Sequence, residues 1–303
     1  MNSITEAMLH HAKDLAKTLD AKALVFDAGL LDSLEDDVPA LLDDFKGTDT
    51  CLVLITPSKE LPELPKSDRL HILNLPQVSL TRMSQIKFAV VMGVAEKIFE
   101  RTDVIVCLSG VQNSGRLDFM AVLKVGDEPE IFATDELNPL PPDVQPAVFE
   151  KVLTLASELA AQGREQRPVG AIFVIGDDER VLENSRQLVF NPFKGYSEEE
   201  RNILTGELDE TIKEFSAIDG AFVIRGDGVV LAAGRYLMPK GKPAEPLRSG
   251  LGSRHEAAAA ITAVTDAVAI TLSQSTQTLT LYNSGRALTE IERGRTDKPD
   301  DGA

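Results

Sequence analysis

Hydrophobic and polar residues alternate along the first 135 residues in a pattern that predicts short buried strands between amphipathic helices. Apolar residues recur at helical spacing over 8–19, and a long helix is predicted near 80–100. The strand-like apolar runs are 23–26, 51–56, 70–75, 103–108 and a hairpin of 119–125 with 130–133. Strands that alternate with helices predict an open α/β sheet.

A proline-rich acidic segment, 135–145 (DELNPLPPDVQ), separates this half from a second series of elements. The second series begins with a predicted helix at 148–162, closed by Gly163, and a strand at 170–176. A helical segment at 197–215 and a hairpin at 222–237 follow. The series ends with a helix that starts near Ser253 and two strands, the last of which ends near 282. We therefore predict two domains, 1–140 and 146–292, and a disordered polar tail, 293–303.

Composition narrows the choice of partners. The chain has 31 basic and 48 acidic residues, a net charge of −17, and no tryptophan. Such a surface repels phosphate backbones and anionic membranes, so we expect neither nucleic acid nor a membrane as a partner. Cys51 and Cys107 lie in apolar runs and are expected to be buried thiols. With no apolar stretch near ~18 residues and no signal-peptide pattern, we expect a cytoplasmic protein.

Two short segments carry candidate chemistry. Asp219-Gly220-Ala221 stands directly before a predicted strand, where a carboxylate at a strand end can face a ligand and the small residues let it approach the backbone. A plain turn is the alternative for this segment alone.

The second segment, GLGSRHE at 250–256, is a glycine loop that runs into an alanine-rich helix. Such a helix start offers N–H groups to a phosphate, and Arg254 with His255 adds charge-assisted donors. Ser253 is predicted to be the N-cap, with Glu256 in capping-box spacing. A capped helix with incidental basic residues is the alternative.

Together, the Asp219-Gly220-Ala221 and 250–258 segments resemble the two motifs of the diadenylate cyclase family, Asp-Gly-Ala and Gly-x-Gly-(Thr/Ser)-Arg-His-x-Ala-Ala. The hairpin at 222–237 and the strand ending at Gly176-Asp177 are also similar, and the resemblance covers about 146–288. It implies an α/β domain with a mixed central sheet flanked by helices. The implied activity is condensation of two ATP into cyclic di-AMP and two pyrophosphates.

The resemblance also implies roles for individual residues. Asp219 would be the catalytic carboxylate and would hold a divalent metal, Mn²⁺ or Mg²⁺. Leu237 would lie near adenine, and Gly220 and Ala221 would border the nucleotide. The residues expected at the ATP phosphates and along the helix behind them are Gly252, Ser253, Arg254, His255, Glu256 and Ala257.

Two positions depart from the family pattern. Glu256 stands where the family often has arginine, and Ser273-Gln274-Ser275 stands where many members have Ser-Glu-Glu. Loss of two carboxylates leaves an alternative function open, an inactive adenine-nucleotide-binding sensor with the same fold.

The N-terminal part, most clearly 93–110, is similar to the C-terminal α/β domain of pyruvate kinase, and the two parts together resemble an archaeal-type cyclase without membrane helices. A phosphometabolite enzyme centred on this part is a third, weaker alternative. One chain carries one motif pair, whereas the product has two-fold symmetry. We therefore expect a homo-oligomer with two cyclase domains face to face.

Overall fold

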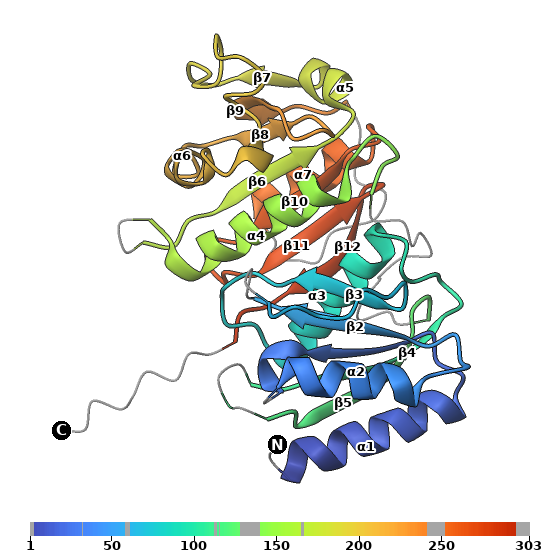
Figure 1. Ribbon diagram of the computed structural model, residues 1–303. Helices are drawn as coiled ribbons and strands as arrows, with labels where there is room; N and C mark the ends of the chain where they lie inside the picture. The colour runs from blue at the N-terminus through green and yellow to red at the C-terminus, as the bar shows by residue number, and fades with distance from the viewer. Residues whose placement is uncertain are drawn as a thin grey trace, which may run out of the picture. The chain divides into compact units, whose positions relative to one another are not determined.

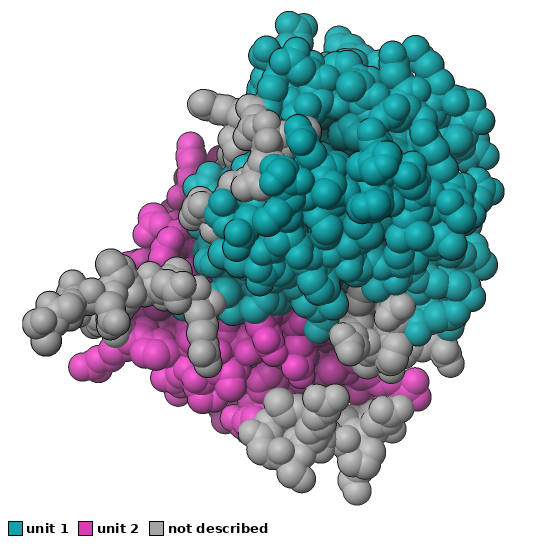
Figure 2. Space-filling model, turned by 90° about the horizontal axis from the view of Figure 1, so that it is seen from below, with its two compact units in different colours: residues 1–129, 293–303 teal, residues 130–292 magenta. Residues whose placement is uncertain are grey.

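The computed structural model describes residues 3–31, 33–57, 61–111, 114, 116–127, 140–164, 167–240 and 252–294. The chain divides into two compact units, residues 1–129 with 293–303 (unit 1) and residues 130–292 (unit 2), coloured separately in Figure 2. The predicted strand at 130–133, part of the predicted linker and the tail from 295 onward lie outside the described residues.

Unit 1 is an open α/β sheet with the strand order β3-β2-β1-β4-β5 (Figure 1). The first four strands run parallel and β5 runs antiparallel to β4. The strands are β1 (Ala23–Asp27), β2 (Cys51–Thr56), β3 (Leu70–Asn74), β4 (Val104–Ser109) and β5 (Phe119–Lys124). The helices are α1 (Ser3–Thr18), a 3₁₀ turn (Ala28–Leu30), α2 (Leu34–Asp44) and α3 (Arg82–Ala95). The predicted fold class is confirmed for this unit.

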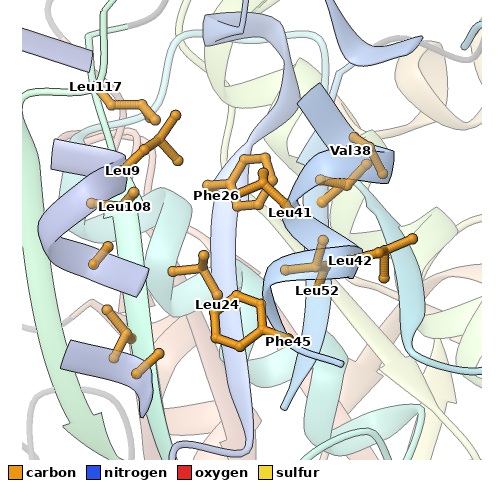
Figure 3. Close-up of a cluster of buried hydrophobic side chains, with 14 of the residues drawn as sticks. Leu9, Leu24, Phe26, Val38, Leu41, Leu42, Phe45, Leu52, Leu108 and Leu117 are labelled. Atoms are coloured by element: carbon orange, nitrogen blue, oxygen red, sulfur yellow. The ribbon is translucent and has the colours of Figure 1, made fainter. Parts of the chain in front are cut away.

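The core of unit 1 follows from the apolar runs of the sequence. Every residue of β1 and β2 is buried, as expected for parallel strands covered on both faces. Helices α1 and α2 pack on one face, where Leu9 of α1 and Leu41 of α2 meet Leu24 and Phe26 of β1 (Figure 3). Helix α3 has buried residues all round and lacks the single apolar stripe of a surface helix.

Two residues that follow the cyclase-like region belong to unit 1. Arg293 forms an antiparallel bridge with Leu80, and the Gly294 amide donates to the Ser79 carbonyl at 2.9 Å. The first two positions of the predicted disordered tail are therefore ordered. Unit 1 is built from two separate stretches of chain.

Unit 2 contains a mixed sheet with the strand order β12-β11-β10-β6-β8-β9-β7. Only β6 and β8 pair in parallel among the described strands of this sheet. The strands are β6 (Ala171–Ile175), β7 (Ser185–Gln187), β8 (Ala221–Ile224), β9 (Val230–Leu237), β10 (Val268–Leu272), β11 (Leu279–Asn283) and β12 (Arg286–Ile291). The predicted mixed central sheet is confirmed.

Helices cover both faces of this sheet. They are α4 (Pro146–Gln162), α5 (Asp178–Glu183), a 3₁₀ turn (Ile203–Thr205), α6 (Asp209–Phe215) and α7 (Ser253–Thr262). Helices α5 and α7 share one apolar cluster with the sheet, in which Val181 and Ala258 meet Val174, whereas α4 lies on the other face (Figure 1). The helix predicted over 197–215 is confined to α6 and the 3₁₀ turn. No helix in the described part of the chain is long and apolar enough to cross a membrane.

Candidate active site

A cavity of about 870 Å³ in unit 2 brings the two predicted motifs together. Its walls come from β6, β7, the residues before β8, the end of β9 and the first turns of α7. The lining residues are Ile172, Arg186, Leu188, Asp219, Gly220, Arg235, Tyr236, Leu237, Met238, Pro239, Ser253, Arg254, Glu256, Ala257 and Ala260. Seven of the ten predicted site residues therefore meet around one space.

Asp219 stands at the mouth of this cavity, just before β8. Its side chain is 91% exposed, and its Oδ1 lies 3.5 Å from Nη2 of Arg254 in α7. A carboxylate this accessible can be reached by a ligand or a metal ion. The pairing joins the Asp-Gly-Ala segment to the Ser-Arg-His segment.

A glycine is required at position 220 because the backbone of the neighbouring strand β9 leaves no room for a side chain there. Its φ is +112°, and a Cβ there would lie 2.6 Å from the Gly234 carbonyl carbon and 2.7 Å from the Arg235 amide nitrogen in β9. The sequence suggested that this glycine admits a ligand, whereas the backbone of β9 fills the space. Ala221 is fully buried in β8 and lines neither this cavity nor the second one described below.

We expect Gly220→Ala to lower the free energy of unfolding by about 3 kcal/mol, because it adds a backbone clash to an unfavourable φ. Gly195→Ala is the matched control, since Gly195 has φ +100° and nothing within 4 Å of the added Cβ. The control should cost about 1 kcal/mol. Denaturant melts measure both values, and equal losses would show that the β9 backbone does not constrain residue 220.

The start of α7 differs from the prediction. Gly252 is the N-cap, in an extended conformation, with no side-chain hydrogen bond, and Ser253 is the first helical residue. The predicted Ser253 cap and the Ser253–Glu256 capping box are therefore wrong. With the cap one residue earlier, the side chains of Ser253 and Glu256 line the cavity. Gly252 stays at the helix start, whereas Gly250 and Leu251 lie outside the described residues.

A second cavity of about 330 Å³ shares Ser253 and Arg254 with the first. Its other lining residues are Gly252, His255, Leu272, Ser273, Gln274 and Ser275. The fold thus brings the Ser273-Gln274-Ser275 run to the start of α7, as a phosphate-binding role would require. No carboxylate from this run enters the cavity, because Gln274 and Ser275 have none.

Arg254 lies between the two cavities, and a glycine makes room for it. A Cβ on Gly170, just before β6, would lie 2.8 Å from Nη1 of Arg254 and 3.2 Å from Cβ of Gln274. The Arg254 side chain is about one third exposed. A cation in this position can donate to an anion in either cavity.

His255 is buried behind this segment. Its Nδ1 lies 2.9 Å from the Tyr282 hydroxyl and 3.2 Å from Oγ1 of Thr271. Burial lowers the pKa of His255, Arg254 lowers it further, and Glu290 opposes both. The imidazole is therefore neutral near pH 7, and it can donate one hydrogen bond but adds no positive charge.

The carboxylates present fit a divalent metal in part. Asp219 and Glu256 line the same cavity, and Mg²⁺ is commonly held by one or two carboxylates together with substrate phosphates. Within the described ranges, no group of three or more His, Cys, Asp or Glu side chains forms a preassembled metal site. The nucleotide itself would have to supply the remaining oxygens.

The residues at the rim of the larger cavity were not predicted from the sequence. The Arg186 guanidinium lies 5.3 Å from the ring centre of Tyr236, and both line the cavity with Leu188 and Met238. Tyr236 and Met238 flank the predicted Leu237, so their places in the hairpin could have suggested them. Arg186 and Leu188 come from β7 and the residue after it, and nothing in the sequence marks them.

Comparison with known families assigns both halves of the chain. Residues 158–287 match the family described as "DisA bacterial checkpoint controller nucleotide-binding". Residues 5–132 match the family described as "Probable sensor domain DacZ_P". Similarity of the N-terminal half to pyruvate kinase is not shown by these matches.

Two curated relatives are both named "Diadenylate cyclase". One, from Methanocaldococcus jannaschii, is 36% identical over 208 residues, which are 68% of this chain and 66% of that protein. The other, from Haloferax volcanii, is 31% identical over 257 residues, which are 82% of this chain and 88% of that protein. With its paired motifs in one cavity and these relatives along most of its length, the chain belongs to the diadenylate cyclase family.

Proposed function

We propose that this diadenylate cyclase binds ATP in the 870 Å³ cavity and uses Asp219 and Arg254 to make cyclic di-AMP. The observation that carries the proposal is the 3.5 Å approach of Asp219 to Arg254, which joins motifs from different parts of the chain at one cavity. Phosphoryl transfer depends mainly on positioning and charge neutralisation, and a carboxylate, a guanidinium and a helix start can supply both.

Each group has a distinct role in the proposal. Arg254 and the first amides of α7 hold the ATP phosphates, and Leu237, almost fully buried at the end of β9, contacts the adenine. Asp219 accepts the proton of the ribose 3′-hydroxyl as that oxygen attacks the α-phosphate of the second ATP. The leaving pyrophosphate carries away the negative charge that Arg254 stabilised.

Cyclases of this family are metal-dependent, and we propose that Mg²⁺ or Mn²⁺ serves this chain. A bound divalent ion neutralises phosphate charge and lowers the pKa of the attacking hydroxyl. Asp219 would hold it, and Glu256, in the same cavity, offers a second carboxylate in place of those that Gln274 and Ser275 lack.

The rival function is a nucleotide-binding sensor that has lost its chemistry, and the missing carboxylates at Gln274 and Ser275 favour it. Incubation of the full chain with ATP and either metal, followed by chromatography of the products, separates the two. We expect cyclic di-AMP and pyrophosphate in a ratio of one to two. Binding of ATP without any product would establish the sensor.

Self-association is part of the proposal, because each 3′-hydroxyl must reach the α-phosphate of a second ATP. The rim of the cavity carries exposed apolar side chains, among them Tyr236 and Met238, and the neighbouring Phe190 is fully exposed. Such a surface is suited to a face-to-face contact between two copies.

We therefore expect specific activity to rise with enzyme concentration when the contact is weak. At low enzyme concentration, Phe190→Asp should lower the specific activity. Sedimentation with ATP present measures the assembly in parallel. A monomer that makes cyclic di-AMP at a concentration-independent specific rate would contradict the face-to-face arrangement.

For unit 1 we propose a sensing role on the fold of the pyruvate kinase C-terminal domain. The sensor-family match supports the role, and the resemblance of 93–110, which spans the end of α3 and β4, supports the fold.

A further inference from the structure

His255, Tyr282 and Thr271 form a buried polar group directly behind the phosphate-binding segment. They come from α7, β11 and β10, and all three side chains lie in the interior of unit 2. The Tyr282 hydroxyl lies 2.9 Å from Nδ1 of His255. A polar cluster this deep costs free energy unless each donor has an acceptor, so its hydrogens can be assigned.

The donors in this cluster can be assigned one by one. The Thr271 hydroxyl donates to the Thr280 carbonyl at 3.3 Å, which uses its single hydrogen. Burial raises the pKa of Tyr282, so its hydroxyl keeps its proton. Among the described residues, the Tyr282 hydroxyl has no other acceptor within hydrogen-bond reach than Nδ1 of His255. Nδ1 is therefore the acceptor, and in a neutral imidazole the hydrogen is then on Nε2.

Nε2 is at the other end of the ring. It has no hydrogen-bond partner in the described part of the chain, and His255 lines the 330 Å³ cavity beside Ser253 and Arg254. We propose that Tyr282 is a positioning residue that holds His255 in its Nε2–H tautomer, so that the ring presents a hydrogen-bond donor to an ATP phosphate that extends past Arg254 from the 870 Å³ cavity into this one. This inference rests on the proposed function for the identity of the anion.

Without the Tyr282 hydroxyl, the His255 ring can adopt the other tautomer. In Tyr282→Phe, Nδ1–H can donate to Oγ1 of Thr271 at 3.2 Å, and Nε2 becomes an acceptor that faces the phosphates.

The tautomer is measured directly by long-range ¹H–¹⁵N spectra of the full chain, with the His255 signal assigned through its loss in His255→Gln. We expect the Nε2–H pattern in the unmodified chain and a shift toward Nδ1–H in Tyr282→Phe. Calorimetry should show that Tyr282→Phe weakens ATP binding roughly tenfold at pH 8, because a donor to a charged group is lost.

Thr271→Val is the control. It removes the second hydroxyl but leaves Tyr282 in place, so the tautomer should not change and ATP affinity should stay within about twofold. An Nδ1–H pattern at His255 in the unmodified chain would overturn the inference, even if Tyr282→Phe and Thr271→Val do not fold. A Thr271→Val effect equal to that of Tyr282→Phe would overturn it too. The spectra require no turnover, so failure of the proposed catalytic function leaves this test intact.

Discussion

Asp219→Asn is expected to lower cyclic di-AMP formation at least about 1,000-fold, because the amide can neither accept the hydroxyl proton nor hold a cation. ATP binding should survive, since the change keeps the size of the side chain and removes a negative charge from the cavity. Product formation by chromatography and ATP affinity by calorimetry measure the two effects separately.

Asp266→Asn is the matched control. Asp266 is also an exposed carboxylate paired with an arginine, Arg180, at 3.2 Å, but it lines neither cavity. It should leave both turnover and affinity unchanged. Normal turnover in Asp219→Asn would remove Asp219 from catalysis and return the Asp-Gly-Ala segment to the role of a turn.

Arg254→Ala should weaken ATP binding about 10- to 100-fold, because charge-assisted hydrogen bonds to phosphate are lost. Glu256→Gln should instead leave affinity unchanged or raise it a few-fold in the absence of added metal, since its carboxylate shares a cavity with the phosphates. Titration calorimetry at several metal concentrations measures both variants.

Arg180→Ala provides the control for Arg254, because Arg180 is an exposed arginine that pairs with Asp177 and Asp266 outside the two cavities. Its affinity for ATP should match that of the unmodified chain. If Glu256→Gln reduced affinity more than Arg254→Ala did, Glu256 would be the main anchor of the phosphates through a bound metal.

Buried parallel strands were the most predictable part of the fold. A continuous apolar run reports burial on both faces, and β2, predicted at 51–56, spans Cys51–Thr56. Strand β12 was missed, because Arg286–Ile291 mixes polar and apolar residues and pairs only with β11 at the edge of the sheet. An edge strand pairs with only one neighbouring strand, so its sequence is less constrained than that of a central strand.

The site was predictable only where it is encoded by a local motif. Asp219 and Arg254 were predicted to be site residues from their motifs, but their 3.5 Å approach depends on where β8 and α7 lie in the fold. The N-cap of α7 was predicted at Ser253, whereas in the structure it is one residue earlier, at Gly252, whose backbone is extended. Arg186 reaches the cavity through the pairing of β7 with β9, in which Arg186 lies opposite Tyr236. Pairing between distant segments leaves no local signal.

The pairing of Arg293 and Gly294 with Leu80 and Ser79 bears on the order in which the chain can fold during synthesis. The core cluster of unit 1 in Figure 3, with the partly buried side chains packed against it, uses no residue beyond Met120, so its hydrophobic packing can begin as soon as that stretch has left the ribosome. Arg293 and Gly294, which pair with Leu80 and Ser79, are translated only after the whole of unit 2. Unit 1 can thus acquire its core first and its final backbone pairing last, with the nucleotide-binding unit made in between.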